Sequence, residues 1–228
     1  MTDTTTPPVE GNLDRSNDRQ AIWKTINSFT QRRVMTLQGG YRNDSSAAKA
    51  ELARLRSADP SSDERVIDAW ATSFTDAPEE LIGRGDKPSD AEYAIATALH
   101  LYAVHQQSQS DAMHKNGEGL GRAVRRLARV DDLESREKPV MRRFQSLTSA
   151  TDRAEIVRHL RSLVQQFRSE GVPLDYAKLA TDLYFLAQPN SRTSVRLAWA
   201  RDVTRPIKQE TTSPETSGDP APKTPASN

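Results

Sequence analysis

The segment that decides the fold is AEYAIATALHLYAVHQQ, residues 91–107. Its apolar side chains point to nearly every side of a helix instead of forming one stripe, which is typical of a helix buried in the middle of a bundle. Helical spacing also dominates the rest of the chain, and Ala, Leu, Arg, Glu and Gln, all good helix formers, are abundant. No stretch alternates convincingly between β-branched and polar residues. We therefore predict an all-α protein, a compact helical bundle.

Capping residues, apolar spacing and polar breaks give the bounds of further helices. The breaks include QGGYRNDSS at 38–46 and DDLESREKP at 131–139. Trp23, Trp70 and Trp199 each lie on an apolar stripe and are predicted in the core, so binding by base stacking is weakly supported. In the N-terminal half, helices are predicted from Asp14 or Ser16 to Leu37, over 46–57, and from a cap at Ser61 or Ser62 through Val66, Ile67, Trp70 and Phe74. In the C-terminal half, they are predicted over 120–130, from Pro139 to Leu147, over 151–170, over 174–187, and onward from Ser191 or Thr193. The helix over 151–170 is predicted to have its cap at Ser149 or Thr151 and its end at Gly171.

Composition separates the two ends of the chain from its body. Residues 1–12 have two prolines and almost no apolar residues, and residues 207–228 are rich in Pro, Ser and Thr. Neither end can bury enough surface to offset the entropy of ordering. We predict that both are disordered tails. The folded body between them is divided into an N-terminal helical half at 13–110, a polar and mobile connector at 111–119, and a basic C-terminal helical bundle at 120–206.

The chain lacks the residues that several classes of function require. It has no cysteine, which excludes disulfides and thiolate metal sites, and its histidines do not have the spacing of a zinc helix. We interpret His100 as a core or helix-contact residue. Gly117, Gly119 and Gly121 follow no strand, so they indicate a flexible helix entry and only weakly a phosphate loop, whose N–H groups could meet an anion. We predict no catalytic residue, metal, cofactor or small-molecule substrate.

No 18-residue apolar run and no apolar signal core are present. We therefore expect a cytoplasmic protein that does not contact a membrane.

Charge is distributed unevenly along a chain whose net charge is only +1. Residues 13–110 carry 12 Lys/Arg and 14 Asp/Glu, whereas residues 120–168 carry 12 Lys/Arg and 6 Asp/Glu. Residues 192–206 add four arginines against Asp202. A locally basic half in a nearly neutral chain indicates contact with a polyanion, and basic and acidic patches that simply balance across a surface are the alternative.

The basic half begins with GEGLGRAVRRLARV, residues 117–130. An apolar stripe and a basic stripe run along the helix predicted here. The basic stripe has the same spacing as the apolar one but is shifted by two residues, which places the two stripes roughly 200° apart around the helix. Like charges spaced by three and four residues repel one another, so an anion, either an acidic side chain or a phosphate, is expected beside the unpaired arginines. The apolar stripe is Leu120, Ala123, Val124 and Leu127, and the basic stripe is Arg122, Arg125, Arg126 and Arg129.

The helix predicted over 151–170 repeats this design less strictly. Arg142 and Arg143 precede it, and Arg192 and Arg196 lie one turn apart in the last helix. Arginine rather than lysine suits bidentate contact with phosphate, so these rows fit backbone binding better than base stacking. The predicted core face is Ile156, Val157, Leu160, Leu163, Val164 and Phe167, and the opposite face is Arg158, Arg161, Gln165 and Arg168.

The order of several segments resembles the CasB family, the small subunit of the type I-E CRISPR surveillance complex Cascade. The resemblance covers most of residues 20–203 and leaves the tails out. The segments that carry it are NDSSAAKAELARLR, GLGRAVRRLARV, MRRFQSLTSA, IVRHLRSLVQQFRSEGVPLDYAKLATDLYFL and VRLAWARD, with LGRAV, RRF, LRxLV and DYxxLxxDL in that order.

The resemblance implies an all-α, non-catalytic subunit present in two copies that pack head to tail along a spine of guide-RNA-binding subunits. Such a subunit holds unwound DNA while the guide RNA pairs with the target strand, and so stabilises the R-loop in antiviral defence. The implied partners are therefore the backbones of the guide RNA and of the target and displaced DNA strands, other Cascade subunits, and a second copy of the chain.

The resemblance also suggests positions for the nucleic-acid contacts. Family basic positions match Arg122, Arg142, Arg143, Arg158 and Arg161. The complete candidate set adds the rest of the 117–130 stripe and three residues of the N-terminal half, namely Arg125, Arg126, Arg129, Lys49, Arg54 and Arg56.

Two other functions remain open at this point. The arginines could meet only acidic surfaces of partner proteins, which would make the chain a helical scaffold. The stripe Arg122–Arg129 could instead be the recognition helix of a helix-turn-helix regulator, although a row of arginines without Asn, Gln or Ser is poor at reading bases.

Overall fold

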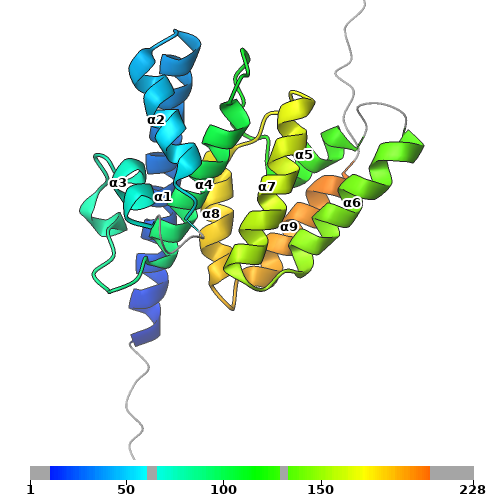
Figure 1. The fold of residues 1–228 in the computed structure, drawn as a ribbon. Helices are drawn as coiled ribbons and strands as arrows, with labels where there is room; N and C mark the ends of the chain where they lie inside the picture. Colours follow the sequence, from blue (N-terminus) through cyan, green and yellow to red (C-terminus); the bar gives the residue numbers. More distant parts are fainter. Residues whose placement is uncertain (1–10, 61–65, 129–132, 206–228) are drawn as a thin grey trace, which may run out of the picture.

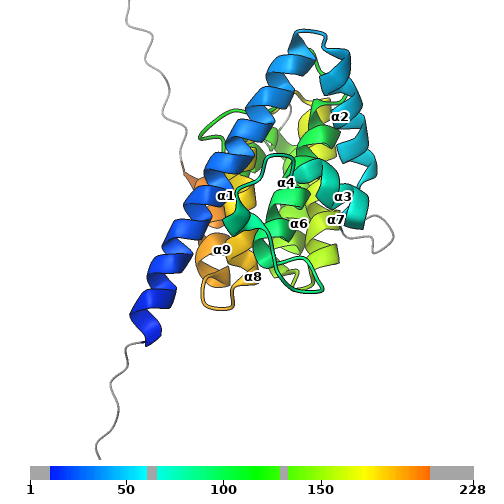
Figure 2. The same cartoon turned by 90° about the vertical axis from the view of Figure 1, so that its left-hand side faces the viewer.

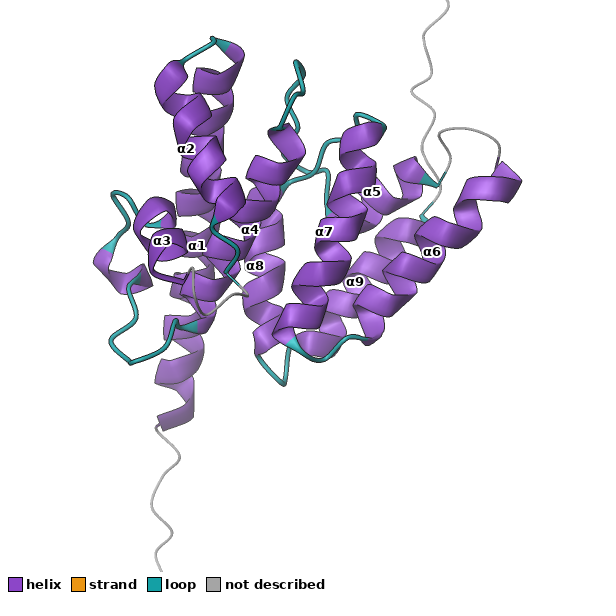
Figure 3. Ribbon diagram, in the orientation of Figure 1, coloured by secondary structure: helices purple, strands orange, loops and turns teal. Residues whose placement is uncertain are grey.

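The computed structural model describes residues 11–60, 66–128 and 133–205, and in these ranges every regular element is a helix (Figures 1 and 3). The predicted all-α fold is therefore confirmed. Beyond the helices there is one isolated bridge in these ranges, between His114 and Leu174. The elements are α1 (Gly11–Arg42), α2 (Ser46–Ser57), α3 (Val66–Ser73), the 3₁₀ helix η2 (Glu79–Leu81), α4 (Asp90–Gln106), α5 (Leu120–Leu127), α6 (Leu133–Ser149), α7 (Arg153–Ser169), α8 (Tyr176–Ala187) and α9 (Arg192–Thr204).

Helix α4 is the centre of the bundle, as its sequence predicts. Fifteen of its residues, from Ala91 to Gln106, are buried, and α1, α2, α3, α7 and α8 all pack against it (Figures 1 and 2). A capping box sets its start, because Ser89 Oγ accepts from Glu92 N at 3.2 Å and Glu92 Oε2 accepts from Ser89 N at 2.7 Å. The helix therefore begins at a defined point and then passes through apolar surroundings on all sides.

Helices α2 and α7 follow their predicted apolar stripes. The bounds of α2 agree with the prediction, and all six predicted core residues of α7 are buried. The cap of α7 differs, since Asp152 takes the place expected for Ser149 or Thr151. Its Oδ1 accepts from Ala154 N at 2.9 Å and from Glu155 N at 3.1 Å, and a carboxylate also suits the positive end of the helix dipole.

Helix α1 extends beyond both predicted ends. It begins at Gly11, inside the segment predicted to be a tail, and Figure 2 shows its first turns extending past the other helices. At its other end it continues through Gly39 and Gly40, where we expected a break. A Cβ on Gly40 would lie 2.7 Å from Cβ of Ala48, so the glycine lets α2 pack closely without ending the helix. The chain turns only at Asp44, whose φ is 61°.

Two further predictions are wrong. Pro139 lies inside α6 instead of opening a helix. The buried side chains of Val140, Phe144 and Leu147 compensate the hydrogen bond that proline removes. Trp70 was predicted in the core but is 39% exposed, and Ile67 of the same helix is 80% exposed, because no other described helix covers the outer side of α3. The predicted caps Ser61 and Ser62 lie outside the described residues.

The two halves of the chain share one core. Helix α8, from the C-terminal half, packs mainly against α1 and α4 of the N-terminal half. The connector at 111–119, expected to be mobile, is instead held in place. Leu174 N donates to Met113 O at 3.0 Å, and Asp175 N donates to Glu118 O at 2.8 Å. Met113 and His114 are buried, so the segment belongs to the folded body.

Candidate nucleic-acid interface

Helix α5 has the two opposed stripes that its sequence predicts. All four predicted apolar residues are buried, whereas Arg122 and Arg126 are exposed and Arg125 is half-buried. Arg129 lies outside the described residues. An eight-residue helix of this composition is too short to be stable alone, so its packing on the bundle holds the arginines in place.

The arginines of α5 are not unpaired, and the structure corrects that expectation. Arg126 Nη2 lies 3.0 Å from Glu118 Oε1, and Lys115 Nζ lies 3.9 Å from the same atom. Arg122 Nη1 donates to Gly117 O at 3.1 Å, and Arg125 Nη1 donates to the carbonyl oxygen of Arg205. One carboxylate thus faces two cations, and the charge around α5 is only partly compensated.

The glycines before and within α5 allow a left-handed backbone conformation at Gly117 and close helix packing at Gly121. Gly117 has a φ of 79°, and its N–H donates to Asp175 Oδ2 at 2.8 Å, so an acidic side chain already occupies this donor. A Cβ on Gly121 would meet the carbonyl oxygen of Trp199 and lie 2.7 Å from Cβ of Asp202. Gly121 therefore lets α5 and α9 approach closely, and the weak phosphate-loop signal has a structural explanation.

The close approach of α9 brings further arginines to α5. Arg205 follows the last turn of α9 beside Arg125, and Arg201 lies one turn earlier and is exposed. We call the combined group the α5–α9 basic cluster: Lys115, Arg122, Arg125, Arg126, Arg201 and Arg205. Two carboxylates pair with it, Glu118 with Lys115 and Arg126, and Asp202 with Arg205 at 3.6 Å.

Three members of this cluster were not among the predicted site residues. The excess of arginine in 192–206 is the signal that could have identified Arg201 and Arg205. Lys115 belongs to the segment interpreted as a connector, and only the tertiary structure places it near Arg126 through Glu118.

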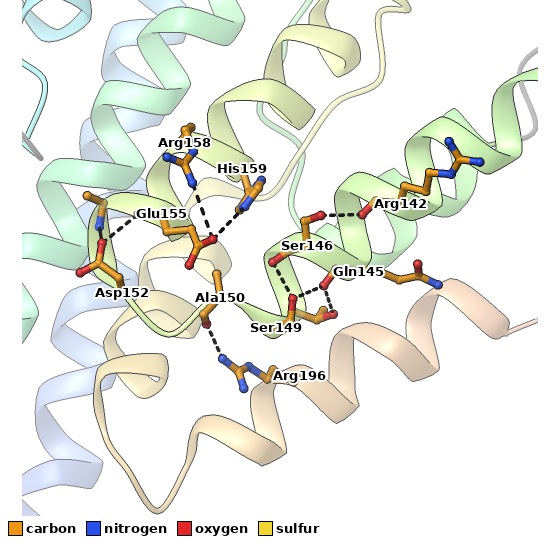
Figure 4. A network of polar contacts seen from close by, with 12 residues as sticks. Arg142, Gln145, Ser146, Ser149, Ala150, Asp152, Glu155, Arg158, His159 and Arg196 are labelled. Atoms are coloured by element: carbon orange, nitrogen blue, oxygen red, sulfur yellow. Dashed lines mark hydrogen bonds and ion pairs between the residues drawn. The ribbon is translucent and has the colours of Figure 1, made fainter.

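The arginines of α7 face different surroundings from those predicted. Arg158 is exposed, and its Nη2 lies 3.6 Å from Glu155 Oε1, which also lies 3.6 Å from His159 Nε2 (Figure 4). Arg161 turns towards α4 and α2, where its Nη1 lies 3.1 Å from His100 Nε2 and 3.6 Å from Asp59 Oδ2. The predicted outward row is thus divided between solvent and the α4–α7 contact.

His100 is the helix contact that the sequence suggested. It is 1% exposed, and its Nδ1 lies 2.9 Å from Leu55 O. A guanidinium only donates, so Nε2 accepts from Arg161 and the proton is on Nδ1, which donates to Leu55 O. Burial lowers the pKa of His100, the nearby Arg161 adds to this, and the Leu55 carbonyl and Asp59 oppose it. The neutral ring therefore links α2, α4 and α7.

The two arginines of α6, Arg142 and Arg143, differ in exposure, as Arg158 and Arg161 of α7 do. Arg142 is exposed and extends from α6, as Arg158 does from the neighbouring α7 (Figure 4). Arg143 is half-buried. When the amide oxygen of Gln166 faces it, this oxygen accepts from Arg143 Nη1 at 2.6 Å and from Nε at 3.2 Å. Arg143 thereby joins α6 to α7.

The basic residues of the N-terminal half lie on α2. Lys49 is exposed and pairs with Asp44, while Arg54 and Arg56 lie in the last turn, where cations also stabilise the negative end of the helix dipole. The contact of Arg161 with Asp59, just beyond α2, brings this turn close to α7. The structure thus brings the end of α2 close to α7 and places the α5 residues in a separate cluster, with α6 packed against both α5 and α7.

No group of three His, Asp or Glu side chains that could hold a metal ion occurs in the described ranges. Within the same ranges, no helix is both long enough and apolar enough to cross a membrane.

Comparisons with a family model and with solved structures point to the same family. Residues 51–202 match the family model for the CRISPR-associated protein Cse2. The chain is similar to the crystal structure of CasB from Thermobifida fusca, with a TM-score of 0.66 and 35% identity over 78% of this chain and 97% of that one. It is also similar to a CRISPR-associated protein of the Cse2 family from Thermus thermophilus, with a TM-score of 0.52 and 25% identity over 79% and 96% of the two chains. Curated proteins gave no significant match.

Proposed function

The chain belongs to the Cse2 (CasB) family of CRISPR-associated proteins and is thus a small-subunit protein of Cascade, and on this premise we propose that it binds nucleic-acid backbone without sequence preference. In this role it holds strands of the R-loop that forms when guide RNA pairs with target DNA, and it catalyses no reaction itself. A second copy of the chain and other Cascade subunits complete the assembly.

The observation that carries this proposal is the α5–α9 basic cluster. Six basic residues lie on α5, on the end of α9 and on the segment before α5, with two carboxylates among them. Arg122, Arg126 and Arg201 are exposed. Phosphate oxygens can accept from guanidinium groups in pairs, and each neutralised phosphate releases counterions, which drives binding. The proposed mechanism is therefore electrostatic.

The type of side chain in the cluster supports binding that ignores sequence. Bases are read through paired contacts from Asn, Gln or well-placed Arg in a groove, and α5 offers no amide side chain. Arg125 is half-buried and donates to the Arg205 carbonyl, so it is poorly available as a base reader. Protein contacts of this kind are suited to tipping the nearly balanced exchange of strands in an R-loop.

The direct test is fluorescence anisotropy of the full chain with single-stranded and duplex oligonucleotides of unrelated sequence, over a series of salt concentrations. Each phosphate contact contributes about 0.7 to the slope of log affinity against log salt for a single strand and about 0.9 for a duplex. We expect a slope of several units and the same affinity for unrelated sequences. A slope near zero would contradict backbone binding, and binding to one defined sequence would favour a regulator.

Matched variants locate the surface. The double variant Arg122→Ala/Arg126→Ala should weaken binding equally for all sequences. If it removes two phosphate contacts, the slope of log affinity against log salt should fall by about 1.4 for a single strand and about 1.8 for a duplex. Glu118→Gln should strengthen binding, because it removes the carboxylate that faces Arg126. Arg84→Ala is the control, since Arg84 is also exposed but lies in the loop after η2 and pairs with Glu79. If all three changes had the same effect, the α5–α9 basic cluster would not be the binding surface.

The same variants test the role in the complex. In Cascade reconstituted with its other subunits, the Arg122/Arg126 double variant should shorten the lifetime of the R-loop while still assembling. If the variant failed to assemble and its isolated form bound DNA normally, the arginines would serve protein contacts, as in the scaffold alternative.

A further inference from the structure

A second surface lies on the far side of the molecule from α5 and takes no part in the α5–α9 basic cluster. A cavity of about 440 Å³ lies between α3 and the loop that leads into α4. Figure 1 shows α3 and α5 on opposite sides of the bundle. The lining includes Ile67, Trp70, Gly83, Asp86, Lys87 and Pro88. Both Ile67 and Trp70 are exposed on α3, and Trp70 is the one that the sequence pattern assigned to the core.

The indole of Trp70 is held in a fixed position at this cavity. Its Nε1 donates to Glu92 Oε1 at 2.7 Å, and its ring stacks on Phe74 with centroids 5.5 Å apart. Phe74 in turn stacks on Phe29 of α1. The ring therefore stays 39% exposed and cannot rotate into the core without breaking a charge-assisted hydrogen bond.

The carboxylate that holds Trp70 is itself fully engaged. Glu92 is 4% exposed and also accepts from Ser89 N at 2.7 Å. Burial raises its pKa, but the hydrogen bonds from Trp70, Ser89 and Gly83 outweigh this and hold the pKa below its ordinary value. A Cβ on Gly83 would press against this carboxylate, so the glycine is required for the arrangement. The site is thus rigid before any partner arrives.

The surroundings of the cavity are acidic. Residues 66–92 contain seven Asp or Glu and two Lys or Arg, in contrast to the basic C-terminal half. Arg84 is paired with Glu79, and Asp90 with Arg153. Four exposed carboxylates, Asp68, Asp76, Glu80 and Asp86, have no ion-pair partner among the described residues. The exposed Lys87 of the lining has none either, so the balance of unpaired charge is negative. Negative potential of this kind repels phosphate and attracts a cationic chain.

We propose that this cavity, the α3 pocket, is a docking site for a basic segment of a partner protein, which places an arginine or lysine side chain on the indole of Trp70. The indole face attracts a cation, Ile67 and Pro88 cover the aliphatic part of the side chain, and Asp86 and Asp68 attract its charge. This surface has the opposite charge to the α5–α9 basic cluster. The chain can therefore hold a nucleic acid on one side and a cationic protein on the other.

The test uses the indole N–H signals of the full chain in ¹H–¹⁵N spectra, with tetra-arginine, tetra-glutamate and oligothymidylate as probes. Trp70→Phe assigns the Trp70 signal. We expect tetra-arginine to move this signal in a saturable way and to leave that of the buried Trp199 unchanged. Tetra-glutamate and oligothymidylate should not move it.

Variants separate a built site from general charge attraction. Trp70→Leu, with its melting temperature measured as a check on folding, should weaken tetra-arginine binding roughly 2- to 30-fold, the range expected for a lost cation–π contact. Asp86→Asn should weaken it several-fold. Asp44→Asn is the control, because Asp44 is also exposed but lies between α1 and α2, and it should have no effect.

Four results would overturn the proposal. They are no movement of the Trp70 signal with millimolar tetra-arginine, movement with oligothymidylate or tetra-glutamate instead, equal weakening by Asp44→Asn, and a shift with protein concentration alone, which would assign the pocket to a second copy. Trp70→Leu should leave DNA affinity unchanged, so failure of this proposal is distinct from failure of backbone binding.

Discussion

Arg161 Nη1 lies 3.1 Å from Nε2 of His100, a contact between residues 61 positions apart in the chain. Through Nδ1 of the same ring the contact continues to Leu55 O on α2. An arginine that the sequence places on an outward row is thus part of the junction between α2, α4 and α7. Its neighbour on that row, Arg158, remains in solvent.

This difference predicts effects of unequal size for two similar substitutions. Arg161→Ala should lower the free energy of unfolding by about 1–2 kcal/mol, because it leaves Nε2 of the buried His100 without a donor. Arg158→Ala should change it by less than about 0.5 kcal/mol, since its pair with Glu155 is exposed. Urea unfolding at pH 7 measures both. Equal effects would show that the His100 contact contributes little in solution.

A second prediction concerns acid. His105 is buried, its Nδ1 lies 2.9 Å from the Tyr176 hydroxyl, and its Nε2 has no hydrogen-bond partner among the described residues. Burial lowers the pKa of His105 to about 3. The unfolded chain therefore binds a proton below about pH 6.5 that the folded chain does not, and stability falls as the pH drops below that value. The loss approaches about 1.4 kcal/mol per pH unit for this one group.

His105→Gln isolates this effect, because glutamine can bond Tyr176 but does not titrate. The variant should be less stable than the parent at pH 7, and the gap should narrow or reverse at pH 5. Urea unfolding at the two pH values measures it. A gap of the same size at both values would show that His105 does not contribute to acid sensitivity.

A third prediction compares two glycines. Gly121→Ala should destabilise the protein by about 1–3 kcal/mol or more, because the added methyl group meets the backbone of α9 at Trp199. Gly39→Ala should instead stabilise it by about 0.5–1 kcal/mol, since Gly39 lies within α1 and nothing lies within 4 Å of its added Cβ. Thermal unfolding distinguishes the two. Gly121→Ala should also weaken oligonucleotide binding, since α5 and α9 would separate.

A fourth prediction concerns the connector. Asp175 caps α8 by accepting from Lys178 N at 2.9 Å, and it also accepts from Gly117 N at 2.8 Å. Asp175→Ala should cost about 1–3 kcal/mol and speed amide hydrogen exchange at residues 113–118. Asp152→Ala removes the cap of α7 alone, so it should lower stability without changing exchange in the connector. Unchanged exchange in Asp175→Ala would mean that other contacts hold the segment.

The helical pattern of the sequence was sufficient for most of the fold. The all-round apolar character of α4 predicted its central place, and the stripes of α2, α5 and α7 identified their buried faces. Breaks were harder to predict, because Gly40 and Pro139 are helix breakers locally but are tolerated where close packing compensates them. The burial of Trp70 was mispredicted for a related reason, since an apolar stripe does not reveal whether another helix covers it.

For the candidate site, the sequence by itself determined the opposed stripes of α5 and the excess of arginine in the C-terminal half, because helical spacing and local charge are properties of neighbouring residues. Only the tertiary structure decided the partners of those arginines. Arg126 meets Glu118, Arg125 meets the Arg205 carbonyl, and Arg161 meets His100. An ion pair or hydrogen bond acts over a few ångströms in space, and which distant residues come within that range depends on how the helices pack.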